Sequence, residues 1–65
     1  MIYTIEKRHE FGYGSIETHY ELISHTHITK IGVYANPETV KRFKTKREAR
    51  KYCVDNNIEY IERLM

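Results

Sequence analysis

The segment Ile16–Ile23 reads Ile-Glu-Thr-His-Tyr-Glu-Leu-Ile, so that larger apolar side chains alternate with polar ones. A strand points successive side chains to opposite faces, which places Ile16, Thr18, Tyr20 and Leu22 together and Glu17, His19 and Glu21 on the other side. This pattern is typical of a half-buried antiparallel strand. A chain that contains such a strand must pair it with others and cover one face of the resulting sheet.

Four further segments are expected to form strands: Ile2–Arg8, Ile28–Ala35, Thr39–Lys44 and Ile58–Leu64. The segment His9–Ser15 contains two glycines, and we expect it to be a hairpin loop with exposed aromatic residues between the first two strands.

The third expected strand, Ile28–Ala35, places Ile31, Val33 and Ala35 on one side. Pro37 follows Asn36 and precedes Glu38, where a type I turn favours proline. This spacing predicts that the chain turns at 36–38 and returns as the fourth strand.

One helix is predicted from Thr45 to about Asn56. The sequence Thr45-Lys46-Arg47-Glu48 fits a capping box, in which the threonine accepts from the amide of the residue three places on. The residues at helical spacing that should face the core are Ala49, Tyr52, Cys53 and Asn56. Asn56 and Asn57 are suited to a left-handed helix end.

These elements give the order β-β-β-β-α-β in a single domain over residues 1–65. The expected fold class is α+β: a small, antiparallel-rich sheet with one helix packed on one face. Eight Ile against two Leu suits a sheet-dominated chain. A domain of 65 residues buries only about 60% of its unfolded surface, so a closed pocket is not expected.

No apolar run approaches the roughly 20 residues that a bilayer requires, so no membrane contact is expected. The first residues lack the basic-then-apolar layout of a secretory signal, which favours a cytoplasmic location. The single cysteine, Cys53, cannot form an internal disulfide and agrees with a reducing compartment.

Charge is distributed unevenly along the chain, whose net charge is +2. Residues 1–26 have a balance of −2, residues 27–52 a balance of +6, and the remaining residues a balance of −2. This asymmetry predicts an anionic partner for the middle segment. The alternative is a solvated face whose charges only keep a small protein soluble.

Within the predicted helix, Lys46, Arg47, Arg50, Lys51 and Val54 fall on one arc of about 140°, opposite the core-facing residues. Lys46 and Arg47 occupy the first turn, where the helix dipole disfavours positive charge by roughly 0.3–1 kcal/mol each. We therefore expect a binding surface made of seven cations: Lys41, Arg42, Lys44, Lys46, Arg47, Arg50 and Lys51. Tyr13 is expected to be a further, exposed aromatic anchor.

Signals for catalysis are absent from the sequence: there is no Ser-His-Asp order, paired-carboxylate cleft, GxGxxG or P-loop, and no cofactor is expected. His25 and His27 form an i, i+2 pair, but zinc requires three or four converging ligands. Polar turn residues are the alternative interpretation of this pair, and whether it binds a metal stays open.

The stretch from Lys41 to Ala49, with its F-x-T-x-x-E-A pattern, resembles the strand-to-helix junction of the hybrid-binding domain at the N-terminus of some ribonucleases H. The whole chain is similar in type to the short orphan proteins of bacteriophages and mobile elements, which are rich in Ile, Lys, Tyr and Glu. That resemblance implies a host-takeover or anti-CRISPR protein, which occupies a surface on a host or defence complex. The alternative is a protein that binds DNA or RNA directly through Lys41–Lys51.

Overall fold

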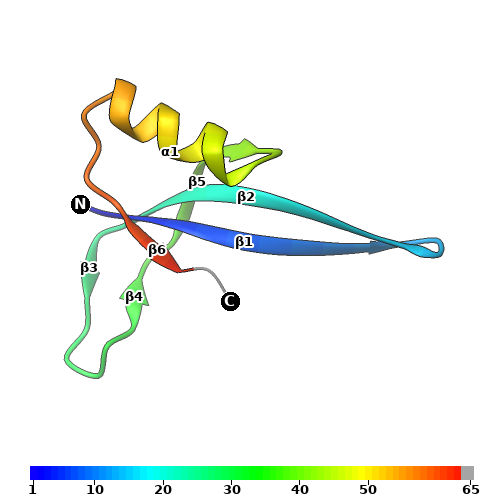
Figure 1. The fold of residues 1–65 in the computed structure, drawn as a ribbon. Helices are drawn as coiled ribbons and strands as arrows, with labels where there is room; N and C mark the ends of the chain where they lie inside the picture. The colour runs from blue at the N-terminus through cyan, green and yellow to red at the C-terminus, as the bar shows by residue number, and fades with distance from the viewer. Residues whose placement is uncertain (64–65) are drawn as a thin grey trace.

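A long antiparallel hairpin is the centre of the fold in the computed structural model, which describes residues 1–63 (Figure 1). Its strands are β1 (Ile2–Gly12) and β2 (Ser15–His25), and their pairing is continuous along the whole length. Both predicted strands are confirmed and both are longer than expected. The expected loop shrinks to a two-residue turn, in which Gly14 has a φ of +71° that L-residues rarely adopt.

Two further strands complete a four-stranded sheet of order β5-β2-β1-β6. Strand β5 (Glu38–Phe43) pairs antiparallel with β2, and β6 (Ile61–Arg63) pairs parallel with β1. The predicted fourth strand is confirmed to within one residue. The closing strand begins at Ile61 and not at Ile58 as predicted, and Leu64, its expected last residue, lies outside the described residues. Ile58 and Tyr60 precede the strand and pack against the core.

The prediction of one continuous strand over Ile28–Ala35 is wrong. The chain forms a small hairpin of β3 (His27–Ile28) and β4 (Tyr34–Ala35) instead, which projects from the main sheet (Figure 1). Gly32 has a φ of +85°, and its amide donates to the Thr29 carbonyl, so the chain reverses here. The supposed apolar face is therefore largely in solvent: Ile31 is 87% exposed.

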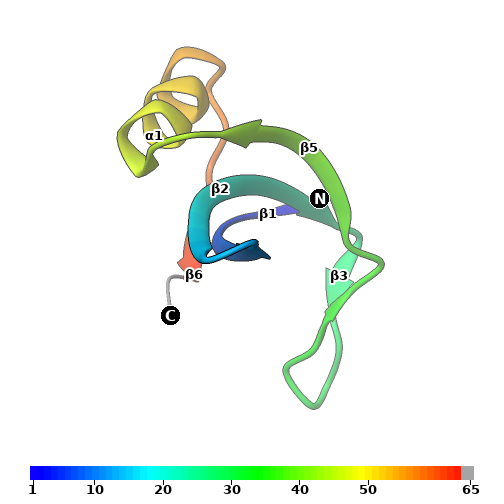
Figure 2. The ribbon, with the colours of Figure 1, turned by 90° about the vertical axis from the view of Figure 1, so that its right-hand side faces the viewer.

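The helix α1 (Lys46–Asp55) confirms the prediction at both ends. The Thr45 side chain accepts from the Glu48 amide at 3.2 Å, as an N-cap does. Asn56 is the C-cap, and Asn57 follows with a left-handed φ of +54°. The helix covers one face of the sheet, as the end-on view shows (Figure 2).

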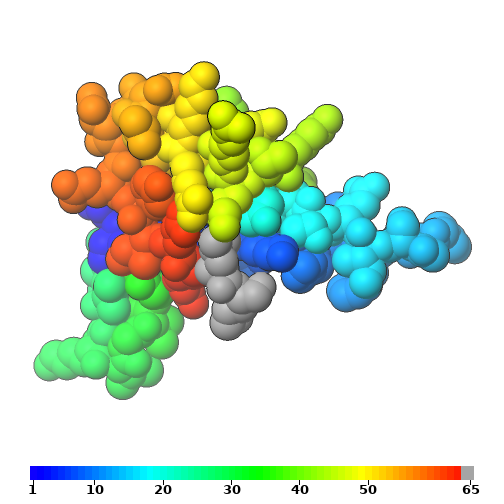
Figure 3. All heavy atoms as spheres, viewed as in Figure 1, coloured from blue at the N-terminus to red at the C-terminus, as the bar shows by residue number. Residues whose placement is uncertain are grey.

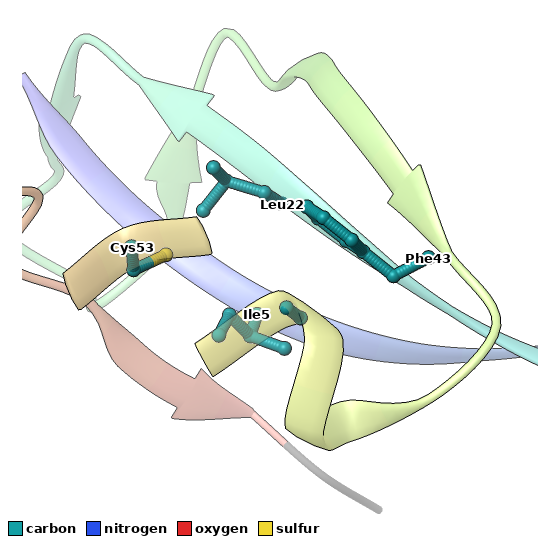
Figure 4. Close-up of a cluster of buried hydrophobic side chains, with 5 residues drawn as sticks. Ile5, Leu22, Phe43 and Cys53 are labelled. Carbon is teal, nitrogen blue, oxygen red and sulfur yellow. The ribbon is translucent and has the colours of Figure 1, made fainter. Parts of the chain in front are cut away.

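The buried core is small and lies between α1 and the sheet. Its members come from the central hairpin, from β5 and from α1: Ile5, Leu22, Phe43, Ala49 and Cys53 (Figure 4). The predicted helix stripe is confirmed at Ala49 and Cys53, neither of which is exposed, and Tyr52 packs beside them. The prediction that Asn56 also faces the core is wrong, because Asn56 is the exposed C-cap and its side-chain amide donates to the Tyr52 carbonyl. Burial also raises the pKa of the Cys53 thiol, which fits a packing role.

Substitution of Ala49 by Glu should unfold the domain, because it forces a carboxylate into this core with no partner. Circular dichroism during heating measures the effect. Val54→Glu is the matched control, since Val54 lies on the same helix and is 67% exposed. A variant Ala49→Glu that melts at the wild-type temperature would show that this face of the helix does not contact the sheet.

Candidate binding site

The hairpin of β1 and β2 extends beyond the rest of the sheet as a two-stranded arm, which we define as residues 7–19 (Figures 1 and 3). Strand β6 pairs only with residues 4–6 of β1, and β5 only with residues 20–24 of β2. The arm therefore has no further strand beside it among the described residues. Tyr13 is fully exposed at its tip, as expected, and its role as an anchor stays a prediction.

The two faces of the arm differ in charge. Cross-strand pairs join Glu6 with Glu21 and Glu10 with Glu17, which places all four carboxylates of the hairpin on one face. This acidic face is opposite to the face that carries the core residues. The other face of the arm presents Lys7, His9, Phe11, Ile16 and Thr18, none of which is acidic.

Arg42 belongs to the acidic face and not to the helix. Its Nη2 lies 2.5 Å from Glu10 Oε1 and 3.1 Å from His19 Nε2. Arg8 lies within 3.4 Å of Glu6 and 3.3 Å of Glu21. These arginines offset the repulsion between carboxylates that face each other across the strands. The charge of Arg42, one of the predicted binding residues, is therefore paired within the fold.

Arg50 also has a partner within the fold. Its guanidinium donates to both carboxylate oxygens of Glu62 on β6, with Nη2 at 2.8 Å from Oε2. This hydrogen bonding lowers the pKa of Glu62 below its ordinary 4.5, and the charges of Arg50 and Lys46 lower it further. The same hydrogen bonding raises the pKa of Arg50. Half-buried Lys46 lies on this side of the helix, so both cations point toward β6.

Lys41 lies on the opposite side of the helix. Its Nζ is 4.8 Å from the ring centroid of Tyr52 and 5.8 Å from that of Phe43, which is cation–π distance. An open hollow of about 360 Å³ lies beside Lys41 and Tyr52. Its lining mixes both signs of charge: Lys41, Arg42, Phe43, Glu48, Lys51, Tyr52 and Asp55. Two carboxylates thus interrupt the cationic surface that the sequence predicts.

What remains of the predicted cations is a smaller surface along the outer side of α1. Lys44, Arg47 and Lys51 are exposed, and no carboxylate of residues 1–63 lies within 4 Å of them. Val54 stands beside Arg47 and Lys51 at helical spacing and is 67% exposed. We call Lys44, Arg47, Lys51 and Val54 the helix crest. Helical spacing alone predicted that three of these residues, Arg47, Lys51 and Val54, lie on one side of the helix.

The two histidines of the i, i+2 pair lie in different surroundings. His25 is buried, its Nε2 2.9 Å from Thr4 Oγ1 and its ring centroid 5.1 Å from that of Tyr34. His27 is exposed and contacts Thr26. Within the described part of the chain, no three His, Cys, Asp or Glu side chains come together as metal ligands do. The described helix is also too short and too polar to cross a membrane.

Comparison with known proteins gives no match: no family model, curated protein or solved structure is similar to this chain. The resemblance to phage and mobile-element proteins, and the local one to the hybrid-binding domain, thus stay expectations from the sequence. The structure offers two surfaces for binding, the helix crest and the arm.

The ion pair between Arg50 and Glu62 predicts a pH dependence. Because the pKa of Glu62 is lowered in the folded state, its stabilisation is fully present above 4.5 and is lost as the pH falls through the folded-state pKa. Glu62→Gln removes this contribution. The variant should be slightly less stable than the wild type at about pH 7, and the difference should vanish near pH ~2.

Urea unfolding at the two pH values measures this difference, with Glu59→Gln as the control, because exposed Glu59 has no ion-pair partner among the described residues. A difference between Glu62→Gln and wild type that grows on acidification would contradict the assignment.

Proposed function

We propose that this chain is a non-catalytic, cytoplasmic binding protein that docks through its helix crest onto an anionic protein surface. The partner is a host or defence complex that handles nucleic acid, and the chain acts on it as an accessory or inhibitory protein of the phage or mobile-element type, as anti-CRISPRs do. The observation that carries the proposal is the helix crest, in which the exposed apolar Val54 lies beside Arg47 and Lys51, and no described carboxylate is within 4 Å of its cations.

The placement of charge along α1 supports a role in binding. Cations occupy the first turn at Lys46 and Arg47, and the last turn of Lys46–Asp55 carries no basic residue. This order opposes the helix dipole, which favours negative charge at the start and positive charge at the end. The charge of Lys46 acts on Glu62 of β6, but Arg47 has no carboxylate within 4 Å among the described residues. The charge of Arg47 does not serve the stability of the helix, and an anionic partner gives it a role.

The chemistry of the crest favours a protein partner over a nucleic acid. Val54 gives the crest an apolar centre, and protein interfaces combine such a centre with a polar or charged rim. Glu48 and Asp55 stand beside the cations on the same helix and would repel a continuous row of phosphates. Direct binding of DNA or RNA through Lys41–Lys51 is therefore the weaker alternative.

The test uses the double variant Arg47→Glu/Lys51→Glu. Both side chains are exposed and unpaired with described carboxylates, so the free energy of unfolding should change by no more than about 0.5 kcal/mol. Arg50 is unsuitable for this test, because Arg50→Glu would bring two carboxylates together at Glu62. Affinity capture from nuclease-treated host lysate identifies the partner, and titration of the purified partner then measures binding.

The double variant should bind that partner at least tenfold more weakly, a loss of about 1.4 kcal/mol. Lys30→Glu is the control, because Lys30 is an exposed cation on the β3–β4 loop, away from the crest. Full-strength binding by the double variant would show that the crest is only a solvated face. Binding of duplex DNA by the wild type with a salt slope of about −0.9 per phosphate would favour the alternative.

A further inference from the structure

The arm exposes apolar side chains that contribute nothing to the core. Phe11 and Ile16 are cross-strand partners near the tip and are 81% and 65% exposed. A two-stranded ribbon without a covering layer is at best marginally stable in water, so folding alone does not account for these residues. Clustered aromatic and apolar residues on a projecting element indicate a binding surface.

The non-acidic face of the arm forms a continuous series of side chains, which we call the arm track. It consists of three cross-strand pairs: Phe11 with Ile16, His9 with Thr18, and Lys7 with Tyr20. Tyr20 lies at the base, just beyond the arm, where it packs against the core. His9 Nδ1 lies 3.2 Å from Thr18 Oγ1, so a hydrogen bond joins the side chains of the middle pair. The track therefore combines aromatic rings with a cation and contains no carboxylate.

The base of the arm track lies next to the start of α1. Tyr20 pairs with Phe43 of β5, and exposed Lys44 is the residue that follows Phe43. The turn that carries Lys44 lies above the base of the arm (Figure 3). Lys7 is thus the neighbour of Tyr20 on β1, Lys44 follows its neighbour on β5, and the four carboxylates of the hairpin lie on the opposite face.

We propose that the arm track, with Tyr13 at its tip, binds single-stranded nucleic acid, with bases stacked on exposed Phe11 and Tyr13 and phosphates held by Lys7 and Lys44. Surfaces that hold single strands combine aromatic platforms with cations along the backbone path, which is the chemistry of this face. A duplex fits poorly, since its bases are paired and stacked on one another and offer no free face to the exposed rings.

This activity goes beyond docking through the helix crest and uses a second surface, which shares only Lys44 with the crest. Fluorescence anisotropy with a labelled oligothymidine of about 20 nucleotides, and with a duplex of equal length, measures it at ~50 mM salt. The wild type should bind the single strand more tightly than the duplex. Its affinity should fall with salt by a log–log slope of about −0.7 per neutralised phosphate. Binding to neither probe, or tighter binding to the duplex, would overturn the proposal.

Variants locate the contact on the arm. Phe11→Ala/Tyr13→Ala removes two exposed rings and should weaken binding of the oligothymidine at least about tenfold. Lys7→Glu should weaken it and make the salt slope shallower. Glu17→Gln changes the acidic face of the same ribbon and is the matched control, which should not weaken binding. Circular dichroism confirms that each variant is folded, as their exposed positions predict.

The helix variant separates this proposal from the proposed function. Arg47→Glu/Lys51→Glu should lose the protein partner but keep most of its affinity for the oligothymidine. If that variant loses the oligothymidine while Phe11→Ala/Tyr13→Ala retains it, the single strand binds the helix crest and the arm track is refuted. If no protein partner is captured, the oligothymidine result still decides the proposal for the arm.

Discussion

The packing of Ala49 and Cys53 onto the cross-strand pair Ile5–Leu22 is the contact on which the rest of this small structure depends. It fixes which side of α1 faces the sheet and thereby leaves Arg47, Lys51 and Val54 in solvent. It also decides which face of the central hairpin packs against the helix. At the base of the hairpin the opposite face is buried as well, at Thr4, Ile23 and His25. The hydrophobic cluster beneath the helix has five buried residues, because so short a chain buries a limited share of its surface. No other contact in the cluster replaces one that is lost.

The division of charge on the arm follows from that contact. Side chains alternate along a strand, so once Ile5 and Leu22 face the helix, Glu6 and Glu21 must face away from it. A register slip of one residue would reverse both faces. The acidic face then collects Arg8 and Arg42, and the opposite face is left with Lys7 and aromatic rings. The hairpin as a whole is acidic, yet one of its faces is not.

Features with local signals were predictable from the sequence. The alternation in Ile16–Ile23 and the capping sequence at Thr45 each depend on neighbouring residues, and the strand and the helix lie where these signals indicate. The segment Ile28–Ala35 also alternates, but Gly32 allows a reversal that the apolar pattern does not reveal. The pairing of Arg42 with Glu10 joins residues 32 positions apart and had no local signal at all.

The sequence by itself determined the α+β class, the helix with its buried stripe, and the presence of an exposed tyrosine at a hairpin tip, because these follow from short-range periodicity and turn chemistry. The tertiary structure alone decided which of the seven predicted cations remain unpaired. Arg42 and Arg50 are bound by Glu10 and Glu62, carboxylates that only the folded sheet brings to them. Ion pairing depends on distances in space, and spacing along a chain fixes those distances only within one helix or strand.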